Sequence, residues 1–196
     1  MFQPEEPMKT PTSIVATAAL AALSVSLSPA CQAETAPPAA RVETGARAPD
    51  FSAAASDGKT YTLAGLHGKV VVLYFYPKDD TPGCTVEAKG FRDADADLAA
   101  LGAVVLGVSR DDLESHQKFV HKYGLNFPLL SDPDGKIHDA FGAWKEGSVF
   151  GRTAMGVDRS TFVIDGDGIV RKAWHGVDPG EHKAEVLAFV RTLVGK

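Results

Sequence analysis

Apolar residues follow two different periodicities along this chain. Unbroken, largely apolar runs at residues 70–76 and 104–109 predict strands that are covered on both faces. A shorter run at residues 127–130 predicts a third strand. Residues 160–165 and 169–174 flank Gly166-Asp167-Gly168 and predict two more strands that are joined as a hairpin.

Segments with apolar residues at helical spacing lie between the first predicted strands and after the last one. Thr81 can act as an N-cap, with Pro82 at the first helical position, and Gly102 ends this helix. Asp111 and Glu114 resemble a capping box that opens a second helix, which ends at Gly124. A third helix covers residues 181–194. The residues expected to face the core are Cys84, Ala88, Phe91, Leu98 and Leu101 in the first helix, Leu113, Val120 and Tyr123 in the second, and Val186, Leu187, Val190 and Leu193 in the third.

The order of these elements predicts the fold. It is strand, helix, strand, helix, strand, strand, helix, preceded by an N-terminal hairpin around Asp57-Gly58. Alternating strands and helices predict an α/β domain with a central mixed sheet that is flanked by helices. A terminal strand–strand–helix unit after a strand–helix–strand unit is the arrangement of the thioredoxin-like fold. We therefore expect a thioredoxin-like fold with an N-terminal hairpin extension.

Composition narrows the class of protein. The chain has 196 residues, 44% of them hydrophobic and 23% charged, with a formal net charge of -5, as expected for one folded α/β domain. These values exclude a collagen-like, low-complexity or wholly disordered chain. No Lys/Arg cluster is present that would favour a nucleic-acid partner. Only two cysteines occur, Cys31 and Cys84, which excludes a disulfide-stapled mini-protein and a zinc ribbon.

The N-terminal segment has the pattern of a secretory signal peptide. Residues 14–27 are uncharged and mostly apolar, long enough for a signal-peptide core but shorter than the roughly 20 residues that span a bilayer. Met8-Lys9 fits the start of such a segment better than Met1, because Glu5 and Glu6 place negative charge where positive charge is expected. We expect export across the inner membrane to the periplasm, without a membrane span in the mature chain.

Cleavage divides the chain into three parts. Small residues permit cleavage after Ala30 or Ala33. We assign residues 1–33 to the signal peptide, 34–46 to a flexible Pro/Ala-rich leader, and 47–196 to the folded domain. A lipoprotein anchor at Cys31 is the less favoured alternative, since Ser28 stands where an apolar residue is expected.

Cys84 is the strongest candidate for chemistry. It follows a predicted buried strand and lies in the first turn of a predicted helix. Free backbone N–H groups and the helix dipole favour an anion at that place, so the position favours a thiolate. A buried structural cysteine is the alternative, but the strand-to-helix junction with Thr81 and Gly83 beside it favours a nucleophile.

Residues 77–84, PKDDTPGC, resemble the P-x-x-x-T-x-x-C signature of peroxiredoxins. The longer segment YPKDDTPGCTVEAKGFRD is similar to the bacterioferritin-comigratory, or Q-type, thiol peroxidases. The resemblance continues through residues 156–165 and covers about residues 47–194. It implies a thioredoxin-like fold and a thiol-dependent peroxidase that reduces hydrogen peroxide and organic hydroperoxides in antioxidant defence.

The resemblance also implies roles for individual residues. Cys84 would be the peroxidatic cysteine, whose thiolate attacks a peroxide oxygen and becomes a sulfenic acid. Arg159 would stabilise the thiolate and the charge on the departing oxygen. Thr81 would orient the peroxide, Pro77 would shield the thiolate from water, and the backbone N–H groups of Gly83 and Cys84 would contact the substrate.

One departure from the family concerns the second thiol. Many Q-type enzymes have a resolving cysteine five residues after the peroxidatic one, where this chain has Lys89. We expect a one-cysteine mechanism in which an external thiol, thioredoxin-like, glutaredoxin-like or small, reduces Cys84. A Cys31 that survives processing and resolves Cys84 is the alternative. The expected assembly is a monomer or weak dimer.

Two other classes of function fit the sequence less well than a peroxidase. A thiol-disulfide exchange protein is disfavoured because the chain has no C-x-x-C motif. A non-enzymatic chaperone or binding module on the same fold would not need Thr81, Cys84 and Arg159 together. The six histidines lack metal-ligand spacing, and the acidic loops starting at Asp132 and Asp165 are turns without the glutamate of a calcium loop. We expect no metal and no cofactor.

Overall fold

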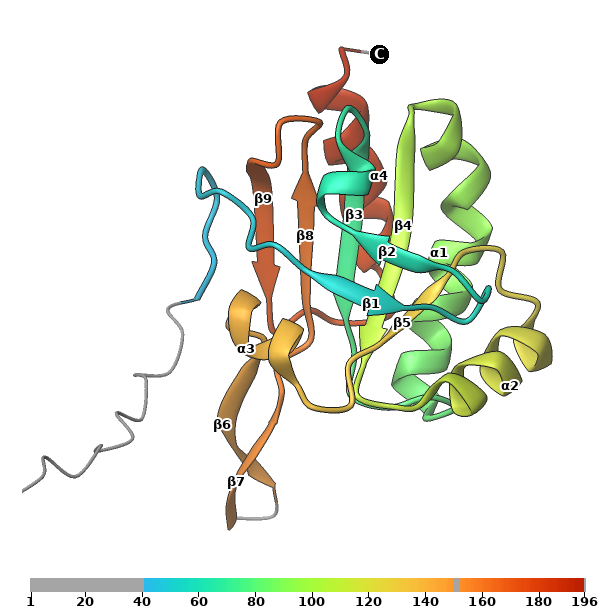
Figure 1. The fold of residues 1–196 in the computed structure, drawn as a ribbon, viewed down its shortest axis with the longest axis vertical. Helices are drawn as coiled ribbons and strands as arrows, with labels where there is room; N and C mark the ends of the chain where they lie inside the picture. Colours follow the sequence, from blue (N-terminus) through green and yellow to red (C-terminus); the bar gives the residue numbers. More distant parts are fainter. Residues whose placement is uncertain (1–40, 150–151, 196) are drawn as a thin grey trace, which may run out of the picture. The chain divides into compact units, whose positions relative to one another are not determined.

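A central five-stranded sheet organises the computed structural model, which describes residues 41–149 and 152–195 (Figure 1). The strand order is β5-β4-β3-β8-β9. β3 pairs in parallel with β4, and β4 with β5, whereas β3–β8 and β8–β9 are antiparallel. The sheet is therefore mixed, and the predicted thioredoxin-like fold is confirmed. The strands are β3 (Val70–Phe75), β4 (Ala103–Ser109), β5 (Leu129–Ser131), β8 (Ser160–Ile164) and β9 (Val170–His175).

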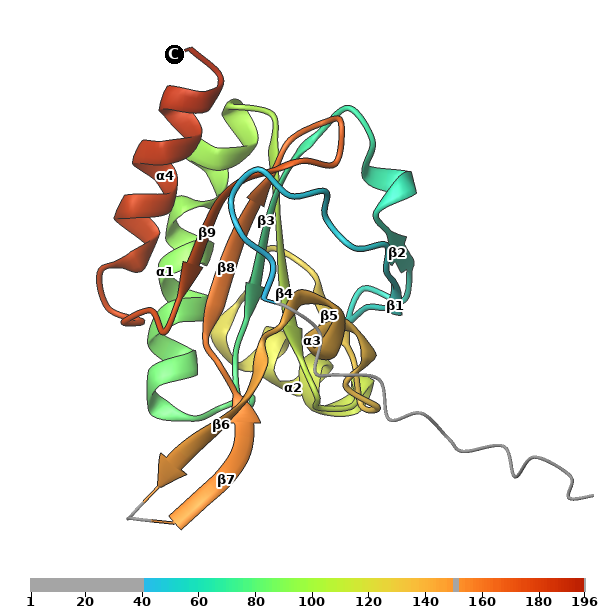
Figure 2. The same cartoon turned by 90° about the vertical axis from the view of Figure 1, so that its left-hand side faces the viewer.

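Helices and a hairpin cover the two faces of the sheet (Figure 2). Alternate residues of β3 enter two separate cores: Val71, Leu73 and Phe75 pack on one side, and Val72 and Tyr74 on the other. This two-sided burial explains the unbroken apolar run, because neither face of the strand meets water. The second core contains residues of α1 (Pro82–Ala100), α2 (Leu113–Tyr123) and α4 (His182–Leu193).

The first helix agrees with its prediction in position and in inward face. α1 has Thr81 at its N-cap, Pro82 at its first residue and Leu101 at its C-cap. Gly102 follows with φ +76°, a conformation that favours glycine. Four of the five residues predicted to face inward are buried, and Leu101 is half-buried.

The second helix starts one residue later than its predicted capping box. Asp112 is the N-cap, and its side chain accepts a hydrogen bond from Ser115 N, so the assignment of Asp111 as the cap was wrong. Asp111 instead accepts bonds from the loop before α1 and from Ser109. The fully buried residues of α2 are His116 and Phe119, while the predicted Leu113, Val120 and Tyr123 are half-buried.

The N-terminal hairpin is present as β1 (Ser52–Ala54) and β2 (Thr60–Thr62). It is followed by a short 3-10 helix, Ala64–Leu66. Besides this 3-10 helix, three elements were not predicted. One is the short helix α3 (Lys136–Phe141), and the others are β6 (Trp144–Val149) and β7 (Arg152–Val157), which form a two-stranded ribbon beside the main sheet (Figure 1). The turn predicted at residues 132–135 is confirmed by the hydrogen bond from Gly135 N to Asp132 O.

Part of the predicted leader contacts the domain. Arg41 forms an ion pair of 2.9 Å with Asp158, Val42 is buried, and Gly45 N donates to Val170 O. The packed part of the chain therefore extends to Arg41 and does not begin at Arg47. The predicted signal peptide and Cys31 lie outside the described residues. No helix within the described residues is long and apolar enough to cross a bilayer.

Candidate active site

Cys84 lies where β3 passes into α1. It is the third residue of α1 and is 1% exposed. The N–H groups of the first helical turn have no partners inside the helix, and the positive end of the helix dipole points at this turn. Both effects stabilise a thiolate relative to a thiol. Cys84 is the one cysteine within the described part of the chain, and it is free.

Arg159 approaches the sulfur of Cys84 from the opposite strand. Its Nη2 donates to Cys84 Sγ at 3.4 Å across a sequence separation of 75 residues. Strand pairing explains this contact: β3 and β8 are antiparallel with Phe75 opposite Ser160. Arg159, the residue before β8, therefore lies beside the end of β3, next to the loop that leads to Cys84. The contact predicted between Arg159 and Cys84 is present.

Glu87 is a residue of this site that the sequence did not reveal. Its carboxylate forms an ion pair with Arg159 Nη1, and the residue is 2% exposed. Its other oxygen, Oε1, has no hydrogen-bond partner among the described residues. Glu87 is three residues after Cys84 on a helix, so the two side chains share a face, and this spacing is the signal that could have identified it.

Burial and charge set the protonation of this pair. Burial raises the pKa of Glu87 from 4.5 to about 7, although the charge of Arg159 and its hydrogen bond act in the opposite direction. Burial tends to lower the pKa of Arg159, but the charge of Glu87 and the contact with Cys84 outweigh it and raise that pKa. Arg159 is therefore cationic, with one edge toward Glu87 and another toward the sulfur.

The remaining predicted site residues surround Cys84 in the chain. Thr81 is half-buried, and its hydroxyl donates to Lys78 O at 3.0 Å, so Thr81 occupies the N-cap position of α1 without a capping bond from its side chain. Pro77 is exposed at the start of the loop. Gly83 lies so close to Arg159 that a Cβ atom on it would be 3.6 Å from Nη2. Lys89, at the position of a resolving cysteine, is exposed.

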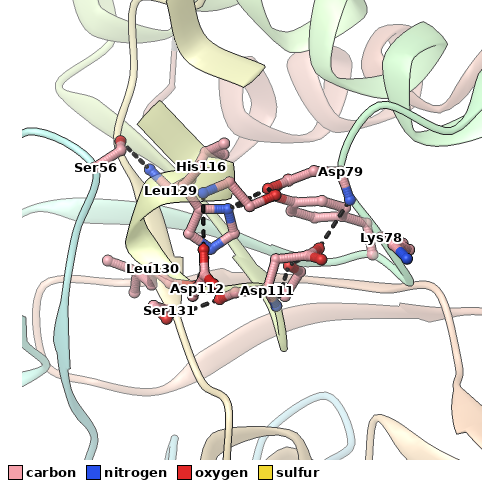
Figure 3. Close-up of polar contacts among 12 residues, drawn as sticks. Ser56, Lys78, Asp79, Asp111, Asp112, His116, Leu129, Leu130 and Ser131 are labelled. Carbon is pink, nitrogen blue, oxygen red and sulfur yellow. Dashed lines mark hydrogen bonds and ion pairs between the residues drawn. The ribbon is translucent and has the colours of Figure 1, made fainter. Parts of the chain in front are cut away.

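A buried hydrogen-bond network attaches the loop at residues 77–81 to α2 (Figure 3). Asp79 accepts bonds from Tyr76 Oη at 2.7 Å and from Ser115 Oγ at 2.8 Å. His116 Nδ1 lies 2.8 Å from the carboxylate of Asp79, and both side chains are almost entirely removed from solvent, at 0% and 4% exposure. Asp79 thus connects the loop to the first two turns of α2.

His116 also connects this loop to the sheet. Its Nε2 lies 3.2 Å from the carbonyl oxygen of Leu130 in β5 (Figure 3). A carbonyl oxygen can only accept, so Nε2 carries a proton in this arrangement. Its Nδ1 faces the carboxylate of Asp79 on the other side of the ring. This pair could not be recognised from the sequence, because a single histidine on a helix is more often a packed core residue.

Two more aspartates fix the backbone of the loop. Asp79 N donates to Asp111 Oδ2 at 2.8 Å. Asp80 has φ 58°, which is uncommon for a residue other than glycine. Its carboxylate accepts bonds from Lys122 Nζ and Tyr123 Oη, and the bond from Lys122 is the main reason that its pKa is lowered. The loop before Cys84 is therefore held along the length of α2.

The chain was compared with known families and proteins. Residues 44–173 match the model of the AhpC/TSA family. Peroxiredoxin Bcp of Bacillus subtilis is 45% identical over 155 residues, which cover 79% of this chain and 99% of that protein. A putative peroxiredoxin bcp of Coxiella burnetii is 45% identical over 146 residues, covering 74% of this chain and 97% of the relative.

Solved structures give the same result. The bacterioferritin comigratory protein of Xanthomonas campestris, described for its alkyl peroxide reduction activity, superposes with a TM-score of 0.72 at 37% identity, covering 80% of this chain and 99% of that chain. A Cys-to-Ser variant of Xylella fastidiosa PrxQ superposes with a TM-score of 0.74 at 34% identity, covering 79% and 98%. The chain belongs to the AhpC/TSA family and, within it, to the Q-type peroxiredoxins, which are thiol-dependent peroxidases.

Proposed function

We propose that this peroxidase reduces hydrogen peroxide and organic hydroperoxides with Cys84 as its nucleophile. The contact of 3.4 Å between Arg159 Nη2 and Cys84 Sγ, at a helix N-terminus, is the observation that carries the proposal. The thiolate attacks one peroxide oxygen, an S–O bond forms and the O–O bond breaks. The departing oxygen takes a proton and leaves as water or an alcohol, and Cys84 remains as a sulfenic acid.

Arg159 and Glu87 act together in this proposal. Arg159 is already aligned on the sulfur, so its charge stabilises the thiolate before reaction and the developing oxyanion during it. Glu87 restrains the guanidinium from the other side and so fixes its orientation. Glu87 is a positioning residue, since its carboxylate contacts Arg159.

Thr81, Pro77 and Gly83 complete the proposed peroxide site. The Thr81 hydroxyl would orient the peroxide, after turning away from the Lys78 carbonyl to which it donates in the present structure. Pro77 would exclude water from the thiolate. The N–H groups of Gly83 and Cys84 are in the first turn of α1, where they are free to donate to the substrate.

Replacement of Cys84 tests the catalytic assignment. Cys84→Ser is nearly isosteric and should retain the fold while abolishing peroxide consumption with dithiothreitol as reductant. The matched control is Ser52→Ala, a small change at an exposed position of β1, outside the proposed chemistry. Peroxide consumption at the native rate by Cys84→Ser would remove Cys84 from the mechanism.

The one-cysteine mechanism and export are parts of the same proposal. Lys89 at the resolving position supports reduction by an external thiol, and the apolar run at residues 14–27 supports export to the periplasm. Expression of the full chain in a Gram-negative host, with fractionation and N-terminal mass analysis, tests the second point. A chain that retains residues 1–33 in the cytoplasmic fraction would refute export.

A further inference from the structure

A groove with a volume of about 580 Å³ lies at the N-terminal end of α4. Trp174 and His175 of β9 form one side. The other side is formed by acidic residues before and within α4, together with one histidine. The polar residues on this side are Asp178, Glu181, His182 and Glu185.

The groove is acidic, and Lys172 lies beside it, with its Nζ 5.5 Å from the centroid of the Trp174 ring. Among the described residues, no lysine or arginine forms an ion pair with Asp178, Glu181 or Glu185. The nearest ionic contact is between His182 Nδ1 and Glu185 Oε2, at 3.5 Å. The three carboxylates share the groove with the aromatic ring of Trp174. Carboxylates and an aromatic face are the surroundings that bind an ammonium group.

His182 gives an independent indication of a ligand. The residue is 3% exposed and lines the groove. Its Nδ1 has only the long contact with Glu185, and its Nε2 has no hydrogen-bond partner among the described residues. Trp174 and Phe91 hold the ring edge-to-face, with centroids at 5.3 and 6.2 Å. Burial lowers the pKa of His182 and favours the neutral ring, which has one nitrogen able to accept a hydrogen bond. A ligand N–H would satisfy that nitrogen.

The groove borders the surroundings of Cys84. Val177, which also lines it, donates its N–H to Arg159 O at 3.1 Å. Pro179 lies on the other side of Gly83, since a Cβ atom on Gly83 would be 3.6 Å from both Pro179 Cγ and Arg159 Nη2. The same Nη2 contacts the sulfur of Cys84. The backbone that lines the groove is therefore bonded to Arg159, and Pro179 beside it contacts the residue before Cys84.

We propose that the groove binds the ammonium group of a small aminothiol that reduces oxidised Cys84. This inference rests on the proposed one-cysteine mechanism. The thiolate of the aminothiol attacks the sulfenic sulfur, an S–S bond forms, and the S–O bond breaks to release hydroxide, which is protonated to water. A second thiol attacks the mixed disulfide and releases the Cys84 thiolate together with a small disulfide. Two thiols are oxidised as the sulfenic acid is reduced.

Three thiols with a two-carbon chain test the charge preference. Cys84 is oxidised with one equivalent of peroxide, and loss of the sulfenic acid is followed with cysteamine, 2-mercaptoethanol or 3-mercaptopropionate, each rate being divided by the thiolate concentration. We expect cysteamine to react about threefold faster than 2-mercaptoethanol, and 3-mercaptopropionate to react slowest. Arg159 alone would favour the opposite order, so equal rates or a preference for the anionic thiol would overturn the proposal.

Charge-neutralising variants locate the preference. The triple variant Asp178→Asn, Glu181→Gln, Glu185→Gln should bring the ratio of cysteamine to 2-mercaptoethanol close to one. A control with the same change in net charge, Asp50→Asn, Glu114→Gln, Asp139→Asn, alters exposed carboxylates on other elements and should keep the native ratio. Equal loss of preference in both variants would show that net charge, not the groove, is responsible.

Ethylammonium, which has the ammonium group but no thiol, tests binding in the groove independently of the proposed peroxidase chemistry. Ethylammonium should slow reduction by cysteamine and leave reduction by 2-mercaptoethanol unchanged. It should also shift the imidazole NMR signals of His182 in the reduced protein, before any peroxide is added. If no sulfenic acid forms with peroxide, the proposed chemistry fails. If sulfenic acid forms but ethylammonium neither competes nor shifts His182, only the groove assignment fails.

Discussion

The pair formed by Asp79 and His116 offers a quantitative test of how the loop before Cys84 is held. Asp79→Ala and His116→Leu each remove one partner of a contact of 2.8 Å that is almost fully buried. The double variant replaces both with apolar side chains. If the pair acts as a unit, the double variant should be much more stable than the sum of the single changes indicates.

The hydrogen bonds that remain set the magnitude. His116→Leu leaves the Asp79 carboxylate buried with two donors, Tyr76 Oη and Ser115 Oγ, so the loss should lie near the low end for a broken buried pair, about 3 kcal/mol. Asp79→Ala leaves Nδ1 of His116 without its carboxylate, with a similar loss of about 3 kcal/mol. With a coupling of about 2 kcal/mol, the double variant should lose about 4 kcal/mol instead of about 6.

Urea unfolding of the four proteins at neutral pH measures the coupling, and the Cys84 oxidation rate measures its effect on the site. Asp79→Ala should slow oxidation by peroxide about tenfold, because a small displacement of the loop misplaces the attacking sulfur. The control is Glu114→Gln, which removes an exposed pair with Lys118 on the same helix and should leave the stability almost unchanged. Additive losses, or a native oxidation rate in Asp79→Ala, would refute the positioning role.

Three other predictions use the same structure. Arg159→Lys retains the charge but loses the planar fork that contacts both Glu87 and Cys84, so stopped-flow oxidation of Cys84 should slow on the order of 100-fold. The pKa of Glu87 is raised from 4.5 to about 7 in the fold. The free energy of unfolding should therefore be highest below pH 4.5, and should fall by about 3 kcal/mol as the pH rises through 7. Urea titrations across this range should show that slope in the native protein and lack it in Glu87→Gln. Gly107→Ala would place a Cβ atom 2.7 Å from both Tyr74 Oη and Leu129 Cδ2, so we expect a loss of about 1–3 kcal/mol, visible as a lower Tm. Gly156→Ala in β7 is the comparison, because a Cβ atom there would meet nothing within 4 Å.

The sequence predicted those strands and helices that are long enough for their pattern of apolar residues to repeat. β3 has six residues with five buried, and α1 has nineteen, so each shows its pattern over enough positions to be recognised. α3 has six residues, fewer than two turns, and a helical period cannot be seen in such a length. β6 and β7 form a sheet of their own, and the residues of this ribbon whose burial is described are all exposed or half-buried, so they show no alternation with a core face.

The nucleophile of the site could be predicted from the sequence, but most of the residues that surround it could not. Cys84 carries a local signal, the strand-to-helix junction. Arg159 was identified by family resemblance alone, because its contact with Cys84 arises from the antiparallel pairing of two strands far apart in the chain. Glu87 and His116 are polar residues on buried helix faces, and only the fold shows which partners compensate for their burial.

The absence of a cysteine at Lys89 predicts how oxidised Cys84 behaves, and helix geometry shows why adding one would not be sufficient. In the native chain, one equivalent of peroxide should leave a sulfenic acid that a dione reagent traps, and excess peroxide should drive it to sulfinic acid. Lys89→Cys supplies a thiol five residues further along α1, but a rise of 1.5 Å per residue separates the two positions by about 7.5 Å along the helix axis. That separation exceeds what a disulfide can bridge.

The first turns of α1 must therefore unwind before Lys89→Cys can form a disulfide with Cys84. We expect mass spectrometry to show this disulfide after peroxide treatment, less sulfinic acid than in the native protein, and faster disulfide formation in dilute urea, which favours local unwinding. Lys78→Cys is the control, because it adds an exposed thiol on the loop outside α1. A disulfide between Cys31 and Cys84 as the main product in the exported native protein would overturn the one-cysteine mechanism. A rate of disulfide formation in Lys89→Cys that is independent of urea would instead show that α1 is already open around Cys84, contrary to the buried position of its sulfur.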